Sequence, residues 1–255
     1  IGGEGIILVS GPTGSGKTTT LYSTLNKLES PDVNIVTVED PIEYDLDNIN
    51  QAQINAKSGV TFASALRSIL RQDPDIIMVG EVRDEETVEL GIRAALTGHL
   101  VFSTIHTNDA ASGFTRLLNW NVEPFLIAST VKGILAQRLV RRVCKECRQP
   151  YEASEDELRM IGLEPQDSFE AYKGKGCLAC RNTGFKGRIG IYELLLVDAE
   201  ISELVLEQAP GYKIREQARK NGMRTLLEDG IIKVNRGDTT ISEVYETLGT
   251  TKIII

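Results

Sequence analysis

An α/β fold with a mostly parallel sheet and helices on both of its faces is the class that this sequence predicts. Short apolar runs rich in β-branched residues alternate along the chain with segments whose apolar residues recur at helical spacing. A glycine-rich stretch stands where the first of these runs meets the first helical segment. The length of 255 residues is enough for one large α/β domain, or for a core domain with a small appendage.

The elements of the predicted core follow in order along residues 1–142. Apolar, β-rich runs predict buried strands at 5–11, 33–40, 75–81 and 99–106. Amphipathic runs predict helices at 17–30, 61–72, 84–98, 109–120 and 124–142. In the second of these helices, Phe62, Leu66 and Ile69 fall on one side, as expected of a helix that covers a sheet.

The composition changes beyond the core. Residues 143–190 are rich in Gly, Lys, Arg and Cys and show little long-period patterning. An ordered pattern resumes at 187–198, and three or four short helices are predicted from there to the end. We therefore predict three regions: a core over 1–142, a small insertion over 143–190 and a helical region over 191–255.

Bulk properties narrow the possible functions. The formal net charge of −8 argues against a general nucleic-acid binder, which is usually basic. No apolar run approaches the ~18 residues that cross a bilayer. With only four cysteines in a chain too large to need disulfide staples, a reducing compartment is expected. The sequence begins at Ile1 without Met, so we expect it to be a piece of a longer protein.

The glycine-rich stretch "GPTGSGKT" matches the phosphate-loop pattern G-x-x-x-x-G-K-[ST] between a predicted strand and a predicted helix. Its backbone N–H groups and the helix N-terminus can surround phosphate oxygens, while the lysine reaches the β- and γ-phosphates and the last hydroxyl ligates Mg²⁺. A chance glycine-rich turn is the alternative. The predicted nucleotide-binding residues are Gly11, Pro12, Thr13, Gly14, Ser15, Gly16, Lys17 and Thr18, with Thr18 as the magnesium ligand.

Acidic residues end two other predicted strands. Glu81 follows "DIIMVG", at the strand end where α/β sheets place their ligands, and could ligate Mg²⁺ through water or polarise an attacking water. Glu39, Asp40 and Glu43 crowd three carboxylates into five residues, which is unfavourable unless a cation or an arginine offsets the repulsion. A capping acid and a solvated loop are the respective alternatives.

The two histidines of the chain bracket the strand predicted at 99–106. His99 is near its start and His106 near its far end, so they cannot both serve one small site. His106 is at the end where a nucleotide would bind, whereas a structural role is expected for His99.

Four segments in this order and spacing carry a family resemblance. They are "GPTGSGKTTTLY", "VTVEDPIEYD", "ILRQDPDIIMVGEVRD" and "LTGHLVFSTIHTNDA". They resemble the phosphate loop, Asp box, Walker B segment and His box of the secretion ATPase superfamily, and within it the GspE/PilB group. The resemblance covers essentially the whole chain.

The resemblance implies a RecA-like P-loop NTPase core that hydrolyses ATP to ADP with Mg²⁺. It implies a homo-oligomeric ring, a hexamer in this group, at the cytoplasmic face of the bacterial inner membrane. The expected partners are the inner-membrane platform and the cytoplasmic domains of type II secretion or type IV pilus assembly machinery, with peripheral contact to acidic lipid and no nucleic acid.

Residue by residue, the resemblance implies phosphate and Mg²⁺ roles for Lys17 and Thr18 and a Walker B role for Glu81. Glu39, Asp40 and Glu43 match the Asp box, and His106 matches the His-box sensor. Arginines at family positions tied to hydrolysis or ring contacts are Arg67, Arg71, Arg83, Arg116 and Arg188; salt bridges within the helix layer are the alternative for each.

Family members also carry a domain before the phosphate loop that supplies arginines to the nucleotide. This sequence does not include it, so we expect the chain to bind nucleotide but to hydrolyse it poorly.

All four cysteines stand in two C-x-x-C pairs, Cys144 with Cys147 and Cys177 with Cys180. Four thiolates suit a structural Zn²⁺ site, which could order a stretch that has little core of its own. A thioredoxin-like redox pair is the alternative. Basic residues around the first pair could balance the charge of the site, contact anionic lipid or a partner, or form a solvated face. In the family, such a module marks assembly and secretion ATPases and is missing from retraction ATPases.

Two other functions are open at this stage. RecA-like cores also build nucleic-acid-dependent motor ATPases, although the acidic balance and the lack of a basic strip interleaved with aromatic residues disfavour that reading. A non-catalytic nucleotide sensor or a zinc-dependent interaction module is the third possibility.

Overall fold

Two units make up the structure, a computed structural model that describes residues 3–164 and 169–249. The first unit comprises residues 1–136 and 194–223, and the second comprises residues 137–193 and 224–255. The predicted division into three regions differs from this one in its boundaries, because the C-terminal helices are shared between the two units. The assignment of three functional regions stays a prediction.

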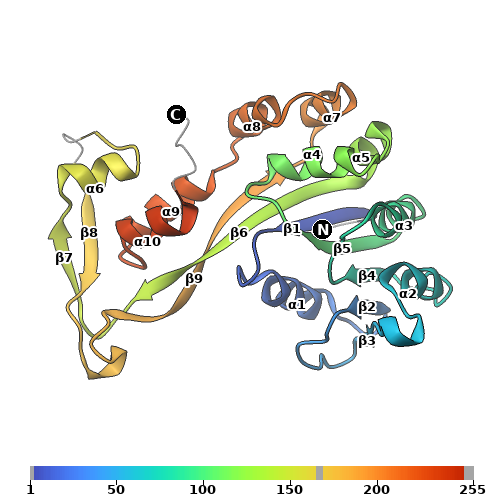
Figure 1. Cartoon of the computed structure of the whole chain (residues 1–255), viewed down its shortest axis with the longest axis horizontal. Helices are drawn as coiled ribbons and strands as arrows, with labels where there is room; N and C mark the ends of the chain where they lie inside the picture. Colours follow the sequence, from blue (N-terminus) through green and yellow to red (C-terminus); the bar gives the residue numbers. More distant parts are fainter. Residues whose placement is uncertain (1–2, 165–168, 250–255) are drawn as a thin grey trace. The chain divides into compact units, whose positions relative to one another are not determined.

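A mostly parallel sheet forms the centre of the first unit, and residues 137–143 and 185–193 of its last two strands belong to the second unit (Figure 1). Its strands are β1 (Gly5–Ser10), β2 (Ile35–Glu39), β3 (Asn50–Gln53), β4 (Ile76–Val79), β5 (Leu100–Ile105), β6 (Val131–Val143) and β9 (Phe185–Leu196). The spatial order is β3-β2-β4-β5-β1-β6-β9, and the pairs β2–β3, β2–β4, β4–β5, β1–β5 and β1–β6 are parallel. The predicted α/β class with a parallel sheet is confirmed.

Helices of the first unit cover both faces of this sheet. They are α1 (Lys17–Leu28), α2 (Phe62–Ile69), α3 (Glu85–Leu96), α4 (Ala111–Asn119), α5 (Pro124–Thr130), α7 (Ala199–Leu206) and α8 (Gly211–Lys220), with a 3₁₀ turn at Ala56–Ser58. Leu21 and Leu25 of α1 pack in one buried cluster with Val9 of β1. Gly91 of α3 instead approaches Ile6 on the opposite face of the same strand.

One predicted helix is wrong over most of its length. Residues 124–130 do form α5, but 131–142 belong to the long strand β6. This segment contains Leu, Ala, Gln and Arg, which are good helix formers, so its local preference favoured a helix. Pairing of Gly133, Ile134 and Leu135 with β1 overrides that preference. The edge strand β3 was not predicted, because its sequence of three polar residues and one alanine lacks an apolar pattern.

In the second unit, β7 (Arg148–Glu152) and β8 (Glu170–Gly174) form an antiparallel pair. Helices α6 (Glu155–Met160), α9 (Leu226–Asn235) and α10 (Ile241–Leu248) accompany it, with a 3₁₀ turn at Leu178–Cys180. A small cluster of Ile161, Ala171, Val234, Ile241 and Val244 forms its apolar core. None of the helices within residues 3–164 and 169–249 is long and apolar enough to cross a bilayer.

Glu243 on α10 ties this unit together through Arg141 of β6. Its carboxylate accepts hydrogen bonds from the Arg141 backbone N–H at 2.9 Å and from the Arg141 Nε at 2.8 Å. Burial raises the pKa of Glu243, but hydrogen bonds from Arg141 and its positive charge outweigh burial and lower it below the ordinary value of 4.5. The folded unit therefore favours the ionised carboxylate.

We expect Glu243→Gln to lower the free energy of unfolding at pH 7 by about 1–2 kcal/mol, because an ionic hydrogen bond is lost beside a half-exposed guanidinium. Since the folded pKa is depressed, the stabilisation is present above the ordinary pKa and is lost as the pH falls through the folded pKa. Urea unfolding followed by circular dichroism from pH 7 to pH 3 should show the difference between variant and wild type shrinking. Glu152→Gln, at an exposed position of β7, is the control.

Candidate functional site

Four strand ends bring the predicted site residues to one edge of the sheet. Since β2, β4, β5 and β1 are parallel neighbours, their carboxyl ends meet there. The register aligns Ser10 with Ile105, and Val79 lies beside both Val38 and Ser103. The phosphate loop, His106, Glu81 and the acidic loop are the segments that leave these four strands. The sheet therefore gathers groups that are up to 95 residues apart in sequence, from Gly11 to His106.

The phosphate loop runs from the end of β1 to the start of α1. Gly14 and Gly16 have φ values of 78° and 87°, which other residues rarely adopt, so the tight turn depends on glycine at both places. The Gly11 N–H donates to the carbonyl of Ile105 at 3.3 Å, which fixes the start of the loop against β5. The Lys17 Nζ donates to the carbonyl oxygens of Gly11 at 2.8 Å and Pro12 at 3.1 Å, so the ammonium lies over the loop.

Glu81 stands two residues beyond the end of β4 and contacts two basic side chains. Its carboxylate is 2.8 Å from the Arg83 guanidinium and 3.0 Å from the His106 Nε2. Burial raises the pKa of Glu81, but the hydrogen bond and charge of Arg83, with those of His106, outweigh it and lower the pKa. Glu81 is therefore held as a carboxylate at neutral pH.

The strand ends that carry Glu81 and His106 are joined by further hydrogen bonds. The hydroxyls of Ser103 and Thr104 donate to the carbonyls of Val79 and Gly80 at 2.7 and 2.8 Å, and the Val82 N–H donates to the carbonyl of Thr104 at 3.0 Å. These bonds reduce the freedom of both strand ends and so fix the separation of the acid from the histidine.

The three acids of the predicted Asp box have different surroundings. Glu39, the last residue of β2, is buried, with an exposed fraction of 2%. Asp40 and Glu43 are exposed. The Asp40 carboxylate is 4.0 Å from the Arg83 guanidinium, so Arg83 bridges the acids that follow two neighbouring strands. This contact offsets the repulsion expected from crowded carboxylates.

The remaining predicted residues lie in local contacts. The His99 ring nitrogen Nδ1 is 2.9 Å from the carbonyl of Ala94, at the end of α3, which fits a structural role. Arg67 pairs with Glu86 of α3, and Arg71 donates to the carbonyl of Arg67 at 2.9 Å.

Two further arginines were predicted to have family roles. The guanidinium of Arg116 stacks on the Trp120 ring at 4.6 Å from its centroid. Arg188 is exposed on β9. Roles for Arg67, Arg71, Arg116 and Arg188 in hydrolysis or ring contacts stay predictions.

Sequence reasoning missed the partners that hold these loops. Arg215 on α8 pairs with Asp109, three residues after His106, and the other oxygen of Asp109 accepts the Ser112 N–H at 2.8 Å near the start of α4. Tyr22 and Gln51 surround Glu39. Motif spacing could not have identified these residues, because each contact joins segments that only the fold brings together.

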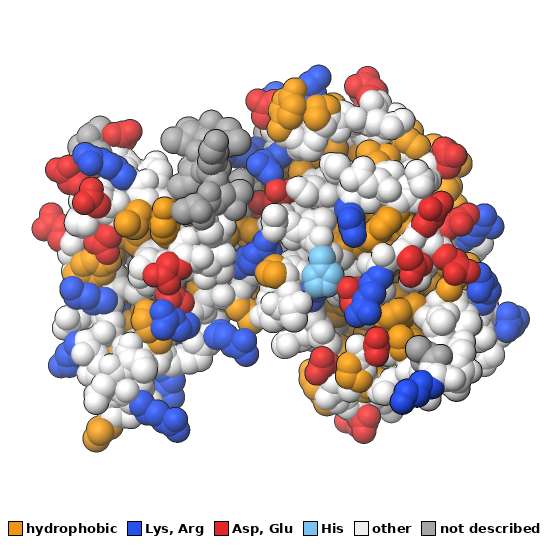
Figure 2. All heavy atoms as spheres, viewed as in Figure 1, with side chains coloured by type: hydrophobic (Ala, Val, Ile, Leu, Met, Phe, Trp, Pro, Cys, Tyr) orange, Lys and Arg blue, Asp and Glu red, His pale blue; other side chains and the backbone are white. Residues whose placement is uncertain are grey.

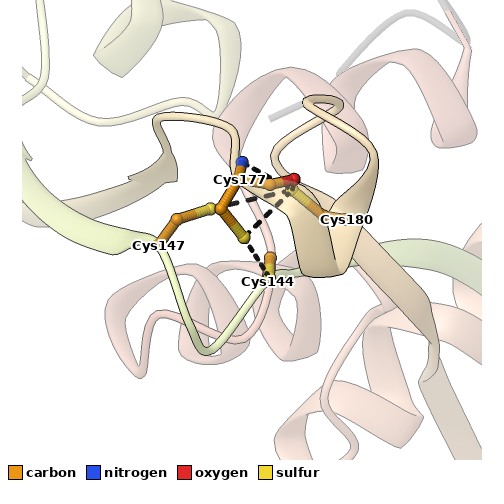
Figure 3. Close-up of side chains that lie close together, drawn as sticks. All are labelled: Cys144, Cys147, Cys177 and Cys180. Atoms are coloured by element: carbon orange, nitrogen blue, oxygen red, sulfur yellow. Dashed lines mark hydrogen bonds between the residues drawn. The ribbon is translucent and has the colours of Figure 1, made fainter.

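The four cysteines converge in the second unit (Figure 3). The sulfurs of Cys144 and Cys177 are 3.8 Å apart, those of Cys147 and Cys180 are 3.8 Å apart, and those of Cys177 and Cys180 are 3.7 Å apart. A tetrahedral ion with metal–sulfur bonds of about 2.3 Å requires sulfur separations of about 3.8 Å. These three separations match that value and all four sulfurs lie within 4.8 Å of one another, so the cluster fits a zinc ion.

Two loops are brought together to form this cluster by a close backbone crossing. A side chain on Gly174 would lie 2.2 Å from the carbonyl oxygen of Gly184, so the crossing requires glycine there. The Cys144 N–H donates to the Gly184 carbonyl at 2.9 Å. Burial raises the pKa of the Cys180 thiol, but backbone N–H donors of Cys177 and Gly184, at 3.2 and 3.3 Å, outweigh it and lower the pKa. Cys180 therefore favours the thiolate, the form that binds metal, whereas burial raises the pKa of Cys147 to about 12 in the absence of an ion.

Known proteins share this architecture and sequence. The chain is 52% identical over 242 residues to the type IV pilus assembly ATPase PilB of Thermus thermophilus, covering 94% of the chain and 27% of that protein. It is 49% identical over 241 residues to the type II secretion system ATPase E of Vibrio cholerae, covering 94% of the chain and 48% of that protein. The crystal structure of the pilus retraction motor PilT with bound ADP superposes with a TM-score of 0.73 at 30% identity, over 98% of this chain and 63% of that one.

The chain thus spans between about a quarter and a half of the length of these curated relatives. The family model for "Type II/IV secretion system protein" matches residues 3–246, which is almost the whole sequence. The resemblance carried by the four sequence motifs is confirmed: the chain belongs to the type II/IV secretion system protein family.

Proposed function

We propose that this chain is the nucleotide-hydrolysing part of a motor ATPase that powers type II protein secretion or type IV pilus assembly. The observation that carries the proposal is the convergence of the phosphate loop, Glu81 and His106 at one edge of a parallel sheet. Relatives named as ATPases of both machineries, at about 50% identity, support it.

Different residues at this edge of the sheet would have different roles in phosphoryl transfer. The backbone of Gly11–Thr18 and the Lys17 ammonium would hold the phosphates of ATP, and the Thr18 hydroxyl would ligate Mg²⁺, which offsets phosphate charge when bound. Glu81 stays ionised beside Arg83 and His106, so its carboxylate can accept a hydrogen bond from water and orient it. His106 contacts Glu81 at 3.0 Å, so a change at Glu81 during hydrolysis would alter this contact, as expected of a sensor residue.

The rest of the assembly follows from the relatives. We infer that the chain works in a homo-oligomeric ring, a hexamer, in which neighbouring copies contribute arginines. The ring would act at the cytoplasmic face of the bacterial inner membrane, on the platform and cytoplasmic domains of the secretion or pilus machinery. The named machineries of the relatives support this placement.

An exposed basic surface surrounds the cysteine cluster. In Figure 2 the lower end of the lobe that contains β7 and β8 shows Lys and Arg side chains and no acidic ones. Exposed basic residues near the four cysteines in sequence are Lys145, Arg148, Lys173, Lys175, Arg181, Lys186 and Arg188, and Glu146 is an exposed acid between the first two cysteines. Leu178 is 93% exposed among them. We propose that this end contacts anionic lipid at the membrane, since basic groups beside an apolar side chain suit that surface.

We also propose that Cys144, Cys147, Cys177 and Cys180 hold one Zn²⁺ ion. The sulfur separations of 3.7 to 3.8 Å and the backbone N–H donors to Cys180 support it. The ion would order the C-terminal end of β6 and the loop before β9, which the apolar core of the second unit does not include.

Lys17→Ala should weaken binding of Mg·ATP by about a hundredfold or more, because the ammonium that faces the phosphates is lost. Isothermal titration calorimetry measures the Kd. Lys27→Ala, in the last turn of the same helix, should bind ATP as the wild type does. Equal binding by Lys17→Ala and wild type would contradict the phosphate-loop assignment.

Glu81→Gln should lower single-turnover ATP hydrolysis by about a hundredfold or more while leaving the Kd for Mg·ATP within about threefold, because the amide cannot replace the carboxylate toward water. Single-turnover assays are chosen because they detect slow hydrolysis. The control is Glu89→Gln, which removes an exposed pairing with Arg93 on α3. If Glu81→Gln kept the wild-type rate, Glu81 would have no catalytic role.

The purified chain should contain one zinc per molecule by elemental mass spectrometry, and Cys177→Ser should reduce that content. Removing the metal with a chelator should increase the rate of proteolysis within residues 143–190. It should leave the Kd for Mg·ATP unchanged, since the cysteines and the phosphate loop lie in different units. Lys145→Ala, between the first two cysteines, should retain the metal. Loss of ATP binding on chelation would contradict this separation of roles.

A further inference from the structure

Glu39 differs from the other acids of the site in being buried, and both of its carboxylate oxygens accept hydrogen bonds within the protein. Its Oε1 accepts hydrogen bonds from the Thr37 hydroxyl at 2.6 Å and from the Gln51 Nε2 at 3.1 Å. Its Oε2 accepts from the Tyr22 hydroxyl. With an exposed fraction of only 2%, this carboxylate has no free surface with which to meet a nucleotide, a magnesium ion or an attacking water.

The partners of Glu39 also hold the acidic loop of residues 40–46. The Tyr22 oxygen accepts the Glu43 backbone N–H at 3.3 Å. Gln51 accepts the Leu46 N–H at 2.7 Å and donates to the Tyr44 carbonyl at 3.3 Å. The rings of Tyr22 and Tyr44 meet edge to face, with centroids 4.7 Å apart. Two of the three partners of the buried carboxylate, Tyr22 and Gln51, therefore also contact the loop.

The same network reaches the phosphate loop through α1. Tyr22 is four residues beyond Thr18, so the two side chains lie one turn apart on the same face of this helix. Burial raises the pKa of Tyr22 well above its ordinary value, and Glu39 raises it further, so the hydroxyl keeps its proton and donates throughout the working range of pH. Gln51 anchors the other side of the network on β3.

We propose that Tyr22, Glu39 and Gln51 form a buried strap that positions the acidic loop against the helix leaving the phosphate loop. Glu39 is then a positioning residue, and Asp40 and Glu43 are the exposed acids that the strap holds in place. The inference rests on the proposed ATPase function, because it explains how the acids of the loop are held at a fixed position relative to the bound phosphates. Displacing such groups by about 1 Å is enough to slow a reaction strongly.

Tyr22→Phe tests the strap directly, because it removes one hydroxyl and leaves the Glu39 carboxylate in place. Amide hydrogen exchange by NMR should show protection of the Glu43 N–H falling about two- to tenfold. Gln51→Leu should lower protection of the Leu46 N–H in the same way. Both variants should slow single-turnover ATP hydrolysis about tenfold or more with the Kd for Mg·ATP within about threefold. Tyr212→Phe, at an exposed position of α8, is the matched control and should change neither quantity.

The outcomes separate the strap from its alternatives. Wild-type exchange in Tyr22→Phe and Gln51→Leu would overturn the proposal, as would wild-type hydrolysis in variants whose loop has lost protection. If Glu39 were instead a catalytic residue, amide exchange in Tyr22→Phe and Gln51→Leu would match the wild type while Glu39→Gln abolished hydrolysis. If the wild-type chain bound no ATP but the exchange changes appeared as expected, the proposed function would fail while the strap stood. A fall in hydrolysis that only followed a lower melting temperature would also overturn the positioning role.

Discussion

The parallel pairing of β2, β4, β5 and β1 is the constraint on which the rest of the site depends. Parallel strands direct their carboxyl ends to one edge, so the phosphate loop, Glu81, His106 and the acidic loop emerge side by side. Strand-end hydrogen bonds from Ser103 and Thr104 then fix the neighbouring ends. A chain with the same motifs on antiparallel strands would place these groups at opposite edges, and no single site would form.

Charge balance at this edge explains why the acids can stay together. Arg83 lies between Glu81 and Asp40, and His106 contacts the other oxygen of Glu81, so two carboxylates share two basic groups. Glu39 is handled differently, because burial leaves it no access to a cation. Three hydrogen-bond donors satisfy it instead, which is the condition under which a buried carboxylate can be tolerated. The acids of one short motif are thus separated into exposed and buried roles.

The sequence predicted those parts of the fold in which local pattern and tertiary context agree. The phosphate loop, the strands before Glu81 and His106, and the two cysteine pairs all combine a motif with the right neighbouring elements. Residues 131–142 escaped prediction because their helix-forming side chains are overruled by pairing with β1. The burial of Glu39 also could not be predicted, because the local sequence "VED" does not show that Tyr22 and Gln51 bind its carboxylate. Contacts between distant segments carry no local signal.

The loops around the cysteines in the second unit have little apolar core to hold them in place. Its apolar cluster gathers a few residues from the α6–β8 segment, α9 and α10, while the loops around residues 144–147 and 177–184 have only the cysteine sulfurs at their centre. Loops rich in Gly and Lys bury too little apolar surface to offset the entropy of ordering them. The crossing of Gly174 and Gly184 and the thiolate-stabilising donors to Cys180 supply geometry but little burial. The proposed zinc ion would supply the free energy of ordering that these loops do not obtain from burial.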